Sequence, residues 1–180
     1  VPGHRTFEEV NLRFYVRRRD ASGELRRGVV FLRELVPRRA IAAVARWLYQ
    51  EPYLAVPMSR RTELAAPRGG HVSYGWRFRG VDMRLSAEAE GPSAPLVPGS
   101  EAEFITEHYW GYTRQRDGGT LEYEVVHPRW DVWTATAPRF EGEATGLYGP
   151  AFAAILRAPP PPARVALGSH RALPPGLRTV

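Results

Sequence analysis

Strict alternation of apolar and polar residues is the feature of this chain that most restricts its fold. Residues 10–18 read VNLRFYVRR, and successive side chains of a β-strand point to opposite faces, so this stretch predicts a strand. Its apolar side chains would share a face that packs on a core: Val10, Leu12, Phe14 and Val16. Its polar side chains would share the other face: Asn11, Arg13, Tyr15 and Arg17. That second face is either the solvent-exposed side of a sheet or the polar lining of an enclosed site.

Similar patterns recur along the chain and predict several more strands. We expect strands in these ranges: 10–16, 28–35, 51–64, 71–78, 81–90, 111–116, 120–128 and 130–140, with a last one after residue 162. The first two would be joined by a hairpin turn rich in Asp, Ser and Gly, and the DGG at 117–119 is a strong turn signal. The three strands of the middle region would form an antiparallel meander.

Short helices are expected between these strands. Residues 37–50 place Pro37 in a first helical turn, and one apolar face would pack on the core: Ile41, Val44, Ala45 and Leu48. The spacing of Ser100 and Glu103 fits a capping box at the start of a second helix. The run LYGPAFAAILRA, 147–158, predicts a third.

Two proline-rich segments interrupt the pattern. Residues 91–100, GPSAPLVPGS, predict a loop rather than a domain linker, because little chain remains on either side. The tract PPPP at 159–162 is expected to be a rigid connector rather than a ligand of a proline-reading domain.

The size and composition of the chain suit a single domain, 1–180, with its own core. No apolar run approaches the roughly 20 residues of a membrane-spanning helix. No signal-peptide pattern is visible, although the chain begins at Val1 rather than Met. Cysteine is absent, which removes disulfides, thiolate metal ligands and a cysteine nucleophile. We therefore expect a cytoplasmic protein that does not bind membranes.

The basic residues are unusual, because all 25 are arginine and the chain has no lysine. The formal net charge of +6 indicates an acidic partner. Arginine keeps its charge and its forked donors but is a very poor amine nucleophile, so no side chain here can form a Schiff base.

The order of the motifs NLRFYV, PYLAVPMSRR, FITEHYWGYTR, DGG and VVHPRW resembles that of the YqjF-like family of uncharacterised bacterial proteins, from about Asn11 to about Trp133. That family is placed with the acetoacetate decarboxylase-like fold. The resemblance therefore implies an α+β, mainly β protein: an antiparallel β-barrel or cone with a few short outer helices and a ligand cavity. It also implies a strand-rich segment upstream of NLRFYV, of which this chain has little. The lysine Schiff base of the decarboxylase itself is excluded.

The first candidate site is the polar face of the first strand. Asn11, Arg13 and Tyr15 would present a planar cation between two neutral hydrogen-bonding groups, an arrangement that can hold a carboxylate or phosphate. The alternative is an ordinary solvated strand face.

Further candidates for the cavity wall come from later motifs. Arg60 matches the family's PMSRR motif, whereas Arg61 would face the other way. Glu107, next to Tyr109, could transfer protons if burial raises its pKa, and His127, near Trp130, could act as a base. The ligand-binding candidates are thus Asn11, Arg13, Tyr15, Arg60, Tyr109 and Trp130, and the catalytic candidates are Glu107 and His127.

The remaining motifs argue against common cofactor classes. The five histidines are scattered without a spacing such as HExxH, so we expect no metal. GxGxxG, a lysine-containing phosphate loop and GxSxG are all absent, so we expect no cofactor.

The sequence thus predicts a barrel protein that binds a small anionic organic molecule, with Arg13 as the anchor. Whether it is an enzyme is left open; if so, we expect a lysine-independent lyase or isomerase acting next to a carbonyl. The alternative is a basic nucleic-acid-binding or scaffold protein, which would use the arginine clusters at 17–19, 26–27, 38–39 and 60–61. Most of these clusters fall at hairpin ends or a helix start, which disfavours nucleic acid. A homo-oligomer is left open.

Overall fold

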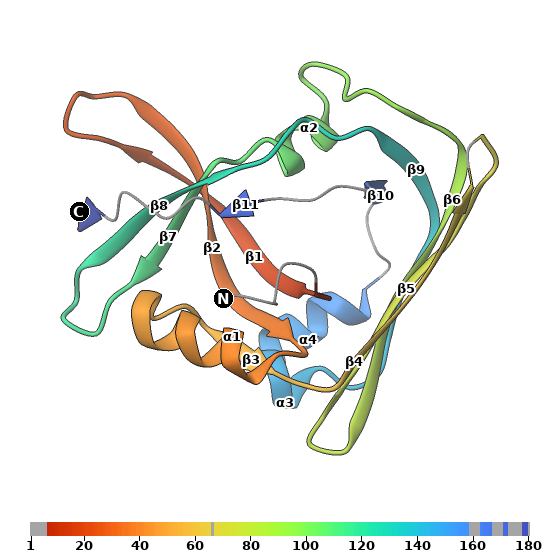
Figure 1. Ribbon diagram of the computed structural model, residues 1–180, viewed down its shortest axis with the longest axis horizontal. Helices are drawn as coiled ribbons and strands as arrows, with labels where there is room; N and C mark the ends of the chain where they lie inside the picture. The colour runs from red at the N-terminus through yellow and green to blue at the C-terminus, as the bar shows by residue number, and fades with distance from the viewer. Residues whose placement is uncertain (1–6, 66, 159–162, 167–170, 173–177, 180) are drawn as a thin grey trace.

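The computed structural model describes residues 7–65, 67–158, 163–166, 171–172 and 178–179. Strands make up 53% and helices 19% of the structure, which confirms the mainly β prediction. Two sheets face each other and form a curled half-barrel (Figure 1).

The first sheet has seven strands and carries the amino-terminal hairpin. Its strands are β1 (Val10–Arg19), β2 (Leu25–Val36), β7 (Trp110–Arg114), β8 (Thr120–Val126) and β11 (Arg171–Ala172) in that order, with β3 (Tyr53–Ala55) beside β2 and β12 (Arg178–Thr179) beside β8. The β1–β2 and β7–β8 hairpins are antiparallel, as predicted. β2 also pairs in parallel with both β3 and β7, which local sequence patterns did not predict.

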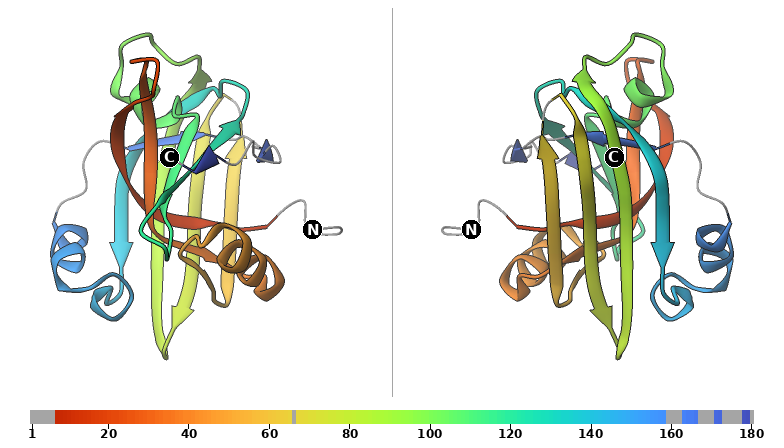
Figure 2. Two further views of the ribbon diagram at one scale, coloured as in Figure 1. Left: turned by 90° about the vertical axis from the view of Figure 1, so that its left-hand side faces the viewer. Right: turned by 90° about the vertical axis from the view of Figure 1, so that its right-hand side faces the viewer.

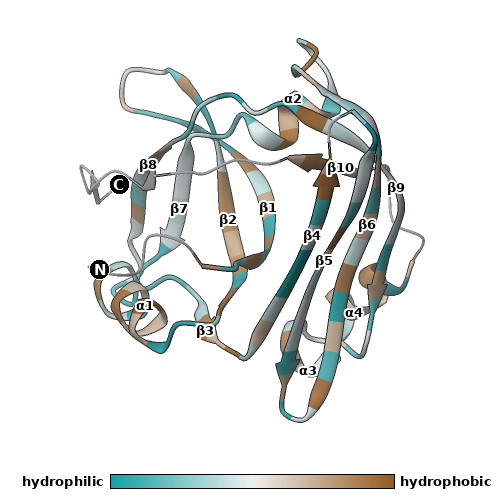
Figure 3. Ribbon diagram, turned by 45° about the vertical axis from the view of Figure 1, so that its right-hand side comes forward, coloured by the Kyte–Doolittle hydropathy of each residue, from teal (hydrophilic) through white to brown (hydrophobic). Residues whose placement is uncertain are grey.

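The second sheet is antiparallel throughout. Its order is β10 (Ala163–Ala166), β9 (Val132–Glu141), β6 (Val81–Ala94), β5 (Gly69–Phe78) and β4 (Met58–Ala65). The predicted meander is confirmed as β4–β5–β6. Alternating apolar and polar bands follow the strand period along β6 (Figure 3).

The main core lies where the two sheets approach each other. Its buried members are Leu35, Val56, Trp76, Met83 and Leu147. Val10 packs against this cluster, but Phe14 on the same alternating series is 45% exposed. The apolar face of the first strand is therefore a core face only at its beginning.

The helices are short and lie at the edges of the half-barrel. They are α1 (Arg39–Val44), which continues into the π-helical turn η1 (Ala45–Tyr49), α2 (Glu101–Thr106), α3 (Thr145–Tyr148) and α4 (Pro150–Arg157). Figure 2 shows α1 and the α3–α4 pair on opposite sides of the molecule. The capping box is confirmed: the Glu103 amide donates to Ser100 Oγ over 3.2 Å, and Glu103 Oε2 accepts from the Gly99 amide over 2.7 Å.

Several local predictions were wrong. The single strand expected over 51–64 is two strands, β3 and β4, in different sheets, and Pro37 precedes the first helix rather than lying in its first turn. The predicted buried face of the first helix is not the buried one: Val44 and Leu48 are exposed, Trp47 is 81% exposed, and Ala42 is buried instead. The period alone cannot show which side of a short helix meets the protein.

The predicted loop 91–100 begins later than expected, because β6 runs on to Ala94 through a bulge between Glu90 and Ala94. The predicted connector 159–162 lies outside the described residues.

Candidate functional site

A pocket of about 610 Å³ opens at the edge where the first sheet, η1 and α3 meet. Segments far apart in the sequence form it: β2, η1, β3, the β5–β6 turn, the β7–β8 hairpin and α3. Five arginines line it: Arg33, Arg46, Arg79, Arg114 and Arg116. Among the described residues, Glu51 is the single acidic residue in its wall. We call this the arginine pocket.

Hydrogen bonds between η1 and the β7–β8 hairpin hold one side of the arginine pocket. Gln50 Oε1 accepts from the Arg116 amide over 2.8 Å, and Gln115 Nε2 donates to the Tyr49 carbonyl over 3.2 Å. Gln50 has a φ of 56° and Arg79 a φ of 49°, a left-handed conformation that is uncommon for residues other than glycine. Both lie in the pocket wall, and such conformations cluster at functional sites.

The cations of the arginine pocket are uncompensated. In the described part of the chain, none of its five arginines forms an ion pair, whereas seven arginines elsewhere do. The Nε atom of Arg33 is also buried without a hydrogen-bond partner among these residues. Buried polar groups are normally satisfied, so a cation donor left free beside a pocket indicates a place for an acceptor.

Two neighbouring glutamates are buried here, Glu51 in the pocket wall and Glu34 beside it, and we call them the acid pair. Glu34 on β2 is 2% exposed and Glu51, just before β3, is 6% exposed. Burial and the nearby Glu51 and Glu9 carboxyls raise the pKa of Glu34 to about 10. Burial also raises the pKa of Glu51, although the Thr113 hydroxyl, which donates to it, and the neighbouring Tyr123 and Glu34 offset part of this effect.

The surroundings of the acid pair come from neighbouring strands. Thr113 of β7 donates its hydroxyl to Glu51, and Tyr123 of β8 lies beside it. Gly111 makes room for the Tyr123 ring, because a Cβ atom at Gly111 would lie 2.2 Å from Tyr123 Cζ. The packing of β7 against β8 thus places Tyr123 beside the acid pair.

The structure places the predicted anion site of the first strand against α2. Arg13 donates to the Ile105 carbonyl over 3.1 Å, and the Tyr15 ring packs on Phe104 with centroids 4.9 Å apart. Asn11 is exposed and donates to Glu9 over 3.2 Å. None of the three predicted residues lines the arginine pocket. The polar face of this strand is therefore neither fully solvated nor a lining of that pocket.

His108 completes the packing between the first strand and α2. Its ring lies 4.6 Å from the Tyr15 ring, centroid to centroid, and the residue is buried. Burial, together with the charges of Arg13 and Arg27, lowers the pKa of His108, so its ring stays neutral at physiological pH.

Four other predicted residues do lie together, and we call them the α2 cluster: Glu107, Tyr109, His127 and Trp130. The His127 ring stacks between Tyr109 and Trp130, with centroids 5.0 and 4.3 Å apart. Tyr109 donates its hydroxyl to Glu107. This hydrogen bond, and to a smaller extent burial, raises the pKa of Tyr109 to about 12. Arg129 Nε lies 3.6 Å from Glu107 Oε2. The carboxylate predicted to transfer protons is thus already held by a cation and a hydroxyl.

The remaining predicted residue, Arg60, is exposed on β4 and lies outside the arginine pocket. Its neighbour Arg61 forms a surface ion pair with Glu63 over 2.8 Å.

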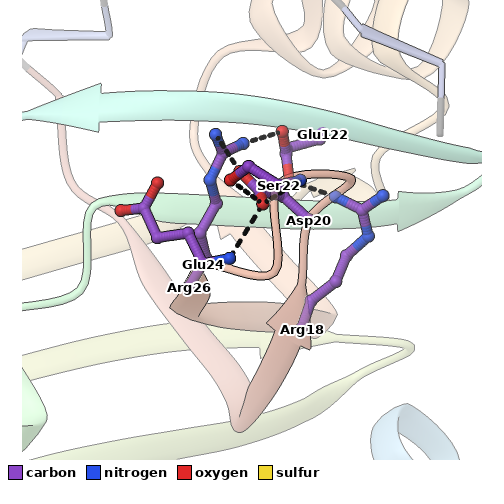
Figure 4. Close-up of polar contacts among 6 residues, drawn as sticks. All are labelled: Arg18, Asp20, Ser22, Glu24, Arg26 and Glu122. Carbon is purple, nitrogen blue, oxygen red and sulfur yellow. Dashed lines mark hydrogen bonds and ion pairs between the residues drawn. The ribbon is translucent and has the colours of Figure 1, made fainter.

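The arginine clusters of the first hairpin are partly neutralised by acids. Figure 4 shows Arg18 and Arg26 reaching from β1 and β2 to Glu122 on β8. Their Nη1 atoms lie 2.8 and 2.6 Å from the two Glu122 carboxylate oxygens, and Arg26 also pairs with Asp20 over 2.9 Å. These contacts attach the hairpin to β8, so these two side chains have a structural role.

Metal binding and membrane spanning can be addressed only for the described residues. Within them, no group of three or more His, Asp or Glu side chains could hold a metal ion. Among the same residues, no helix combines the length and the apolar character that crossing a membrane requires.

Sequence reasoning missed the arginine pocket and the acid pair. The arginines have no common spacing, because they come from separate elements. Glu34 did carry a signal, since it interrupts the apolar strand sequence GVVFLRELV next to Leu35 and Val36. A charged residue within an apolar strand is almost never fully buried unless it is paired, so it marks a special site.

Comparison with known proteins gives a family without a described activity. The model of the family DUF2071, described as an uncharacterized conserved protein, matches residues 1–170. The match confirms that the chain belongs to an uncharacterised family, as the motifs indicated. The resemblance to the YqjF-like family is consistent with this match. No curated protein matches the chain.

Proposed function

The chain belongs to the uncharacterised family DUF2071, and within it we propose that this protein binds a small organic anion in the arginine pocket. The observation that carries the proposal is the convergence of five arginines without ion pairs, among the described residues, on a cavity of about 610 Å³. That volume is within the usual range for small-molecule sites, roughly 300 to 1,000 Å³.

Charge supports an anion rather than a neutral ligand. Cations gathered in a cleft raise the local concentration of anions, and their mutual repulsion is relieved when an anion binds. The guanidinium fork also matches the two oxygens of a carboxylate or phosphate. Arg33 and Arg114 project from β2 and β7, so two of these forks stand on strands rather than on loops.

The proposal moves the anchor away from Arg13. One of the Arg13 donors is used by the Ile105 carbonyl, which is internal to the fold. Arg13 and Arg60 stay predictions as ligand-binding residues, and the experiment below separates them from the pocket arginines.

The acid pair favours a second candidate function, a lysine-independent lyase or isomerase. Glu51 stands in the pocket wall with a raised pKa, which suits a group that transfers protons near neutral pH. In this version Glu51 would take the role that the sequence indicated for Glu107 or His127. Turnover that survives Glu51→Gln would exclude the assignment.

Thermal unfolding against short carboxylates, 2-oxo acids and phosphates tests the binding proposal. A ligand at about 100 times its dissociation constant should stabilise the fold by about 2.7 kcal/mol, roughly 5 to 10 °C for a chain of this size. We expect Arg33→Gln and Arg114→Gln to reduce the shift. Arg164→Gln, at an exposed site on β10, serves as the matched control.

The variants decide where the anion binds. If Arg13→Ala or Arg60→Gln removes the shift and the pocket variants do not, the anchor lies outside the arginine pocket and the proposal is wrong. The absence of a shift with every anion would also reject it.

The half-barrel supports the acetoacetate decarboxylase-like type of fold as a proposal. Two facing sheets with short helices at the edges are what such a barrel or cone would present. The cytoplasmic location, the bacterial origin and a homo-oligomer stay predictions.

A further inference from the structure

We infer that Glu51 carries a proton in the arginine pocket and donates it in a hydrogen bond to the bound anion, so that anion and proton are taken up together. This inference rests on the proposed function and narrows its ligand. The class that fits is a carboxylate with a carbonyl oxygen on the next carbon, a 2-oxo acid. Its carboxylate would meet the arginines, and its carbonyl oxygen would accept from Glu51.

The position of the two Glu51 oxygens supports this role. Oε1 accepts the hydroxyl of Thr113, whereas Oε2 is buried and has no partner among the described residues. Glu51 nevertheless belongs to the pocket wall. A protonated Oε2 has a hydrogen to donate, and a ligand acceptor would satisfy it.

The groups around Glu51 separate into an acidic side and a basic side. On the acidic side are Glu34, whose Oε2 is likewise buried without a partner among these residues, and Glu9. The hydroxyls of Tyr53, Tyr123 and Thr113 complete that side.

The five pocket arginines form the basic side. Burial and the Glu9 carboxyl favour the neutral form of Glu51. An anion bound by the arginines adds a like charge beside Glu51 and favours the neutral form further. Binding therefore shifts Glu51 toward its protonated form, and the proton comes from the solvent.

Titration calorimetry with pyruvate and propionate tests this coupling. Both are monocarboxylates of three carbons, and only pyruvate has the carbonyl oxygen. Titrations in two buffers of different ionisation enthalpy, between about pH 6 and 9, report protons taken up on binding. We expect proton uptake, an affinity that falls by up to about tenfold per pH unit once Glu51 is ionised in the free protein, and pyruvate binding about tenfold tighter than propionate.

Variants assign the effect to Glu51. Glu51→Gln keeps the shape and a donor but cannot ionise, so its pyruvate binding should be independent of pH and without proton uptake. Thr113→Val removes a donor that favours the charged form of Glu51, so the loss of affinity should move to higher pH. Glu107→Gln changes a carboxyl of the α2 cluster and should behave like the wild-type protein.

The outcomes separate this inference from the proposed function. Binding without proton uptake, with the same pH profile in the wild-type protein and Glu51→Gln, overturns the inference and leaves the arginine pocket as an anion site. Proton uptake that disappears in Glu107→Gln also overturns it. If neither monocarboxylate binds and no anion of the thermal panel stabilises the protein, both proposals fail.

Discussion

Strand β8 contributes to two sites with buried glutamates that are neutralised in opposite ways. Glu122 is 1% exposed, and two arginines bind its two oxygens. Tyr123 points to the other face of the sheet and lies beside Glu51 of the acid pair. In the described structure no arginine pairs with Glu51 or Glu34.

The difference shows how a charged residue with a structural role can be distinguished from one that is available to bind a ligand. Around Glu122 the cations and the carboxylate satisfy each other, which leaves little for a ligand. Among the described residues, the pocket arginines lack carboxylate partners and the acid pair lacks cations, although Glu51 lines the same cavity as these arginines. Keeping these groups apart costs stability, and such costs concentrate at functional sites.

The largest expected effect concerns the satisfied glutamate. Glu122→Gln leaves Arg18 without a charged partner and Arg26 with Asp20 alone, and breaking a buried ion pair costs several kcal/mol. Because Arg18 is partly exposed, we expect a loss of about 3 kcal/mol in urea unfolding. Glu124→Gln, at an exposed site on the same strand, should change stability by less than about 0.5 kcal/mol. Equal effects of the two changes would contradict a structural role for Glu122.

The acid pair should respond in the opposite direction. The pKa of Glu34 is raised from its ordinary 4.5 to about 10 by burial and by Glu51. The unfolded chain therefore loses this proton at lower pH than the folded one, and stability falls as pH rises between these values. Glu34→Gln cannot ionise, so at about pH 9 we expect it to exceed the wild-type stability by at least about 2 kcal/mol.

Thermal unfolding across this pH range measures the effect. The two proteins should be close in stability near pH 4, where Glu34 is mostly neutral in both the folded and the unfolded chain. A Glu34→Gln protein that is as sensitive to alkaline pH as the wild type would show that Glu34 is not the group responsible.

Two glycines offer a matched test of packing. A Cβ atom at Gly111 would lie 2.2 Å from Tyr123 Cζ, and one at Gly28 would lie 2.4 Å from Tyr112 Cε2. Overpacking of this kind costs about 1 to 3 kcal/mol, so both alanine variants should unfold at lower temperature. Only Gly111→Ala displaces a ring beside Glu51, so it alone should weaken pyruvate binding. Equal weakening by Gly28→Ala would separate Tyr123 from the site.

The smallest expected effect distinguishes unpaired from paired arginines. Arg114→Gln removes one of several converging cations and should raise stability by about 0.5 kcal/mol at low salt. Arg129→Gln removes an ion partner of Glu103 and Glu107 and should lower stability by a similar amount. Both changes in stability should be smaller at high salt. If the two variants change stability in the same direction, the pocket cations do not repel one another.

Local sequence patterns predicted the hairpins, the meander and the capping box, because each depends on residues close in the chain. They also grouped Glu107 with Tyr109 and His127 with Trp130, and the structure brings these two pairs together. The parallel pairing of β2 with β7 had no local signal. That pairing brings Thr113 and Tyr123 to the acid pair, so the site could not be assembled from spacing.

The sequence by itself determined the chemistry that this protein can use. With arginine as its only strongly basic side chain and no lysine or cysteine, the chain can hold anions, but none of its side chains can form a Schiff base or a thiolate nucleophile. The tertiary structure decided which charges are compensated. Burial and neighbouring charges set the pKa of Glu34 and Glu51, and both arise from contacts between elements that are distant in the sequence.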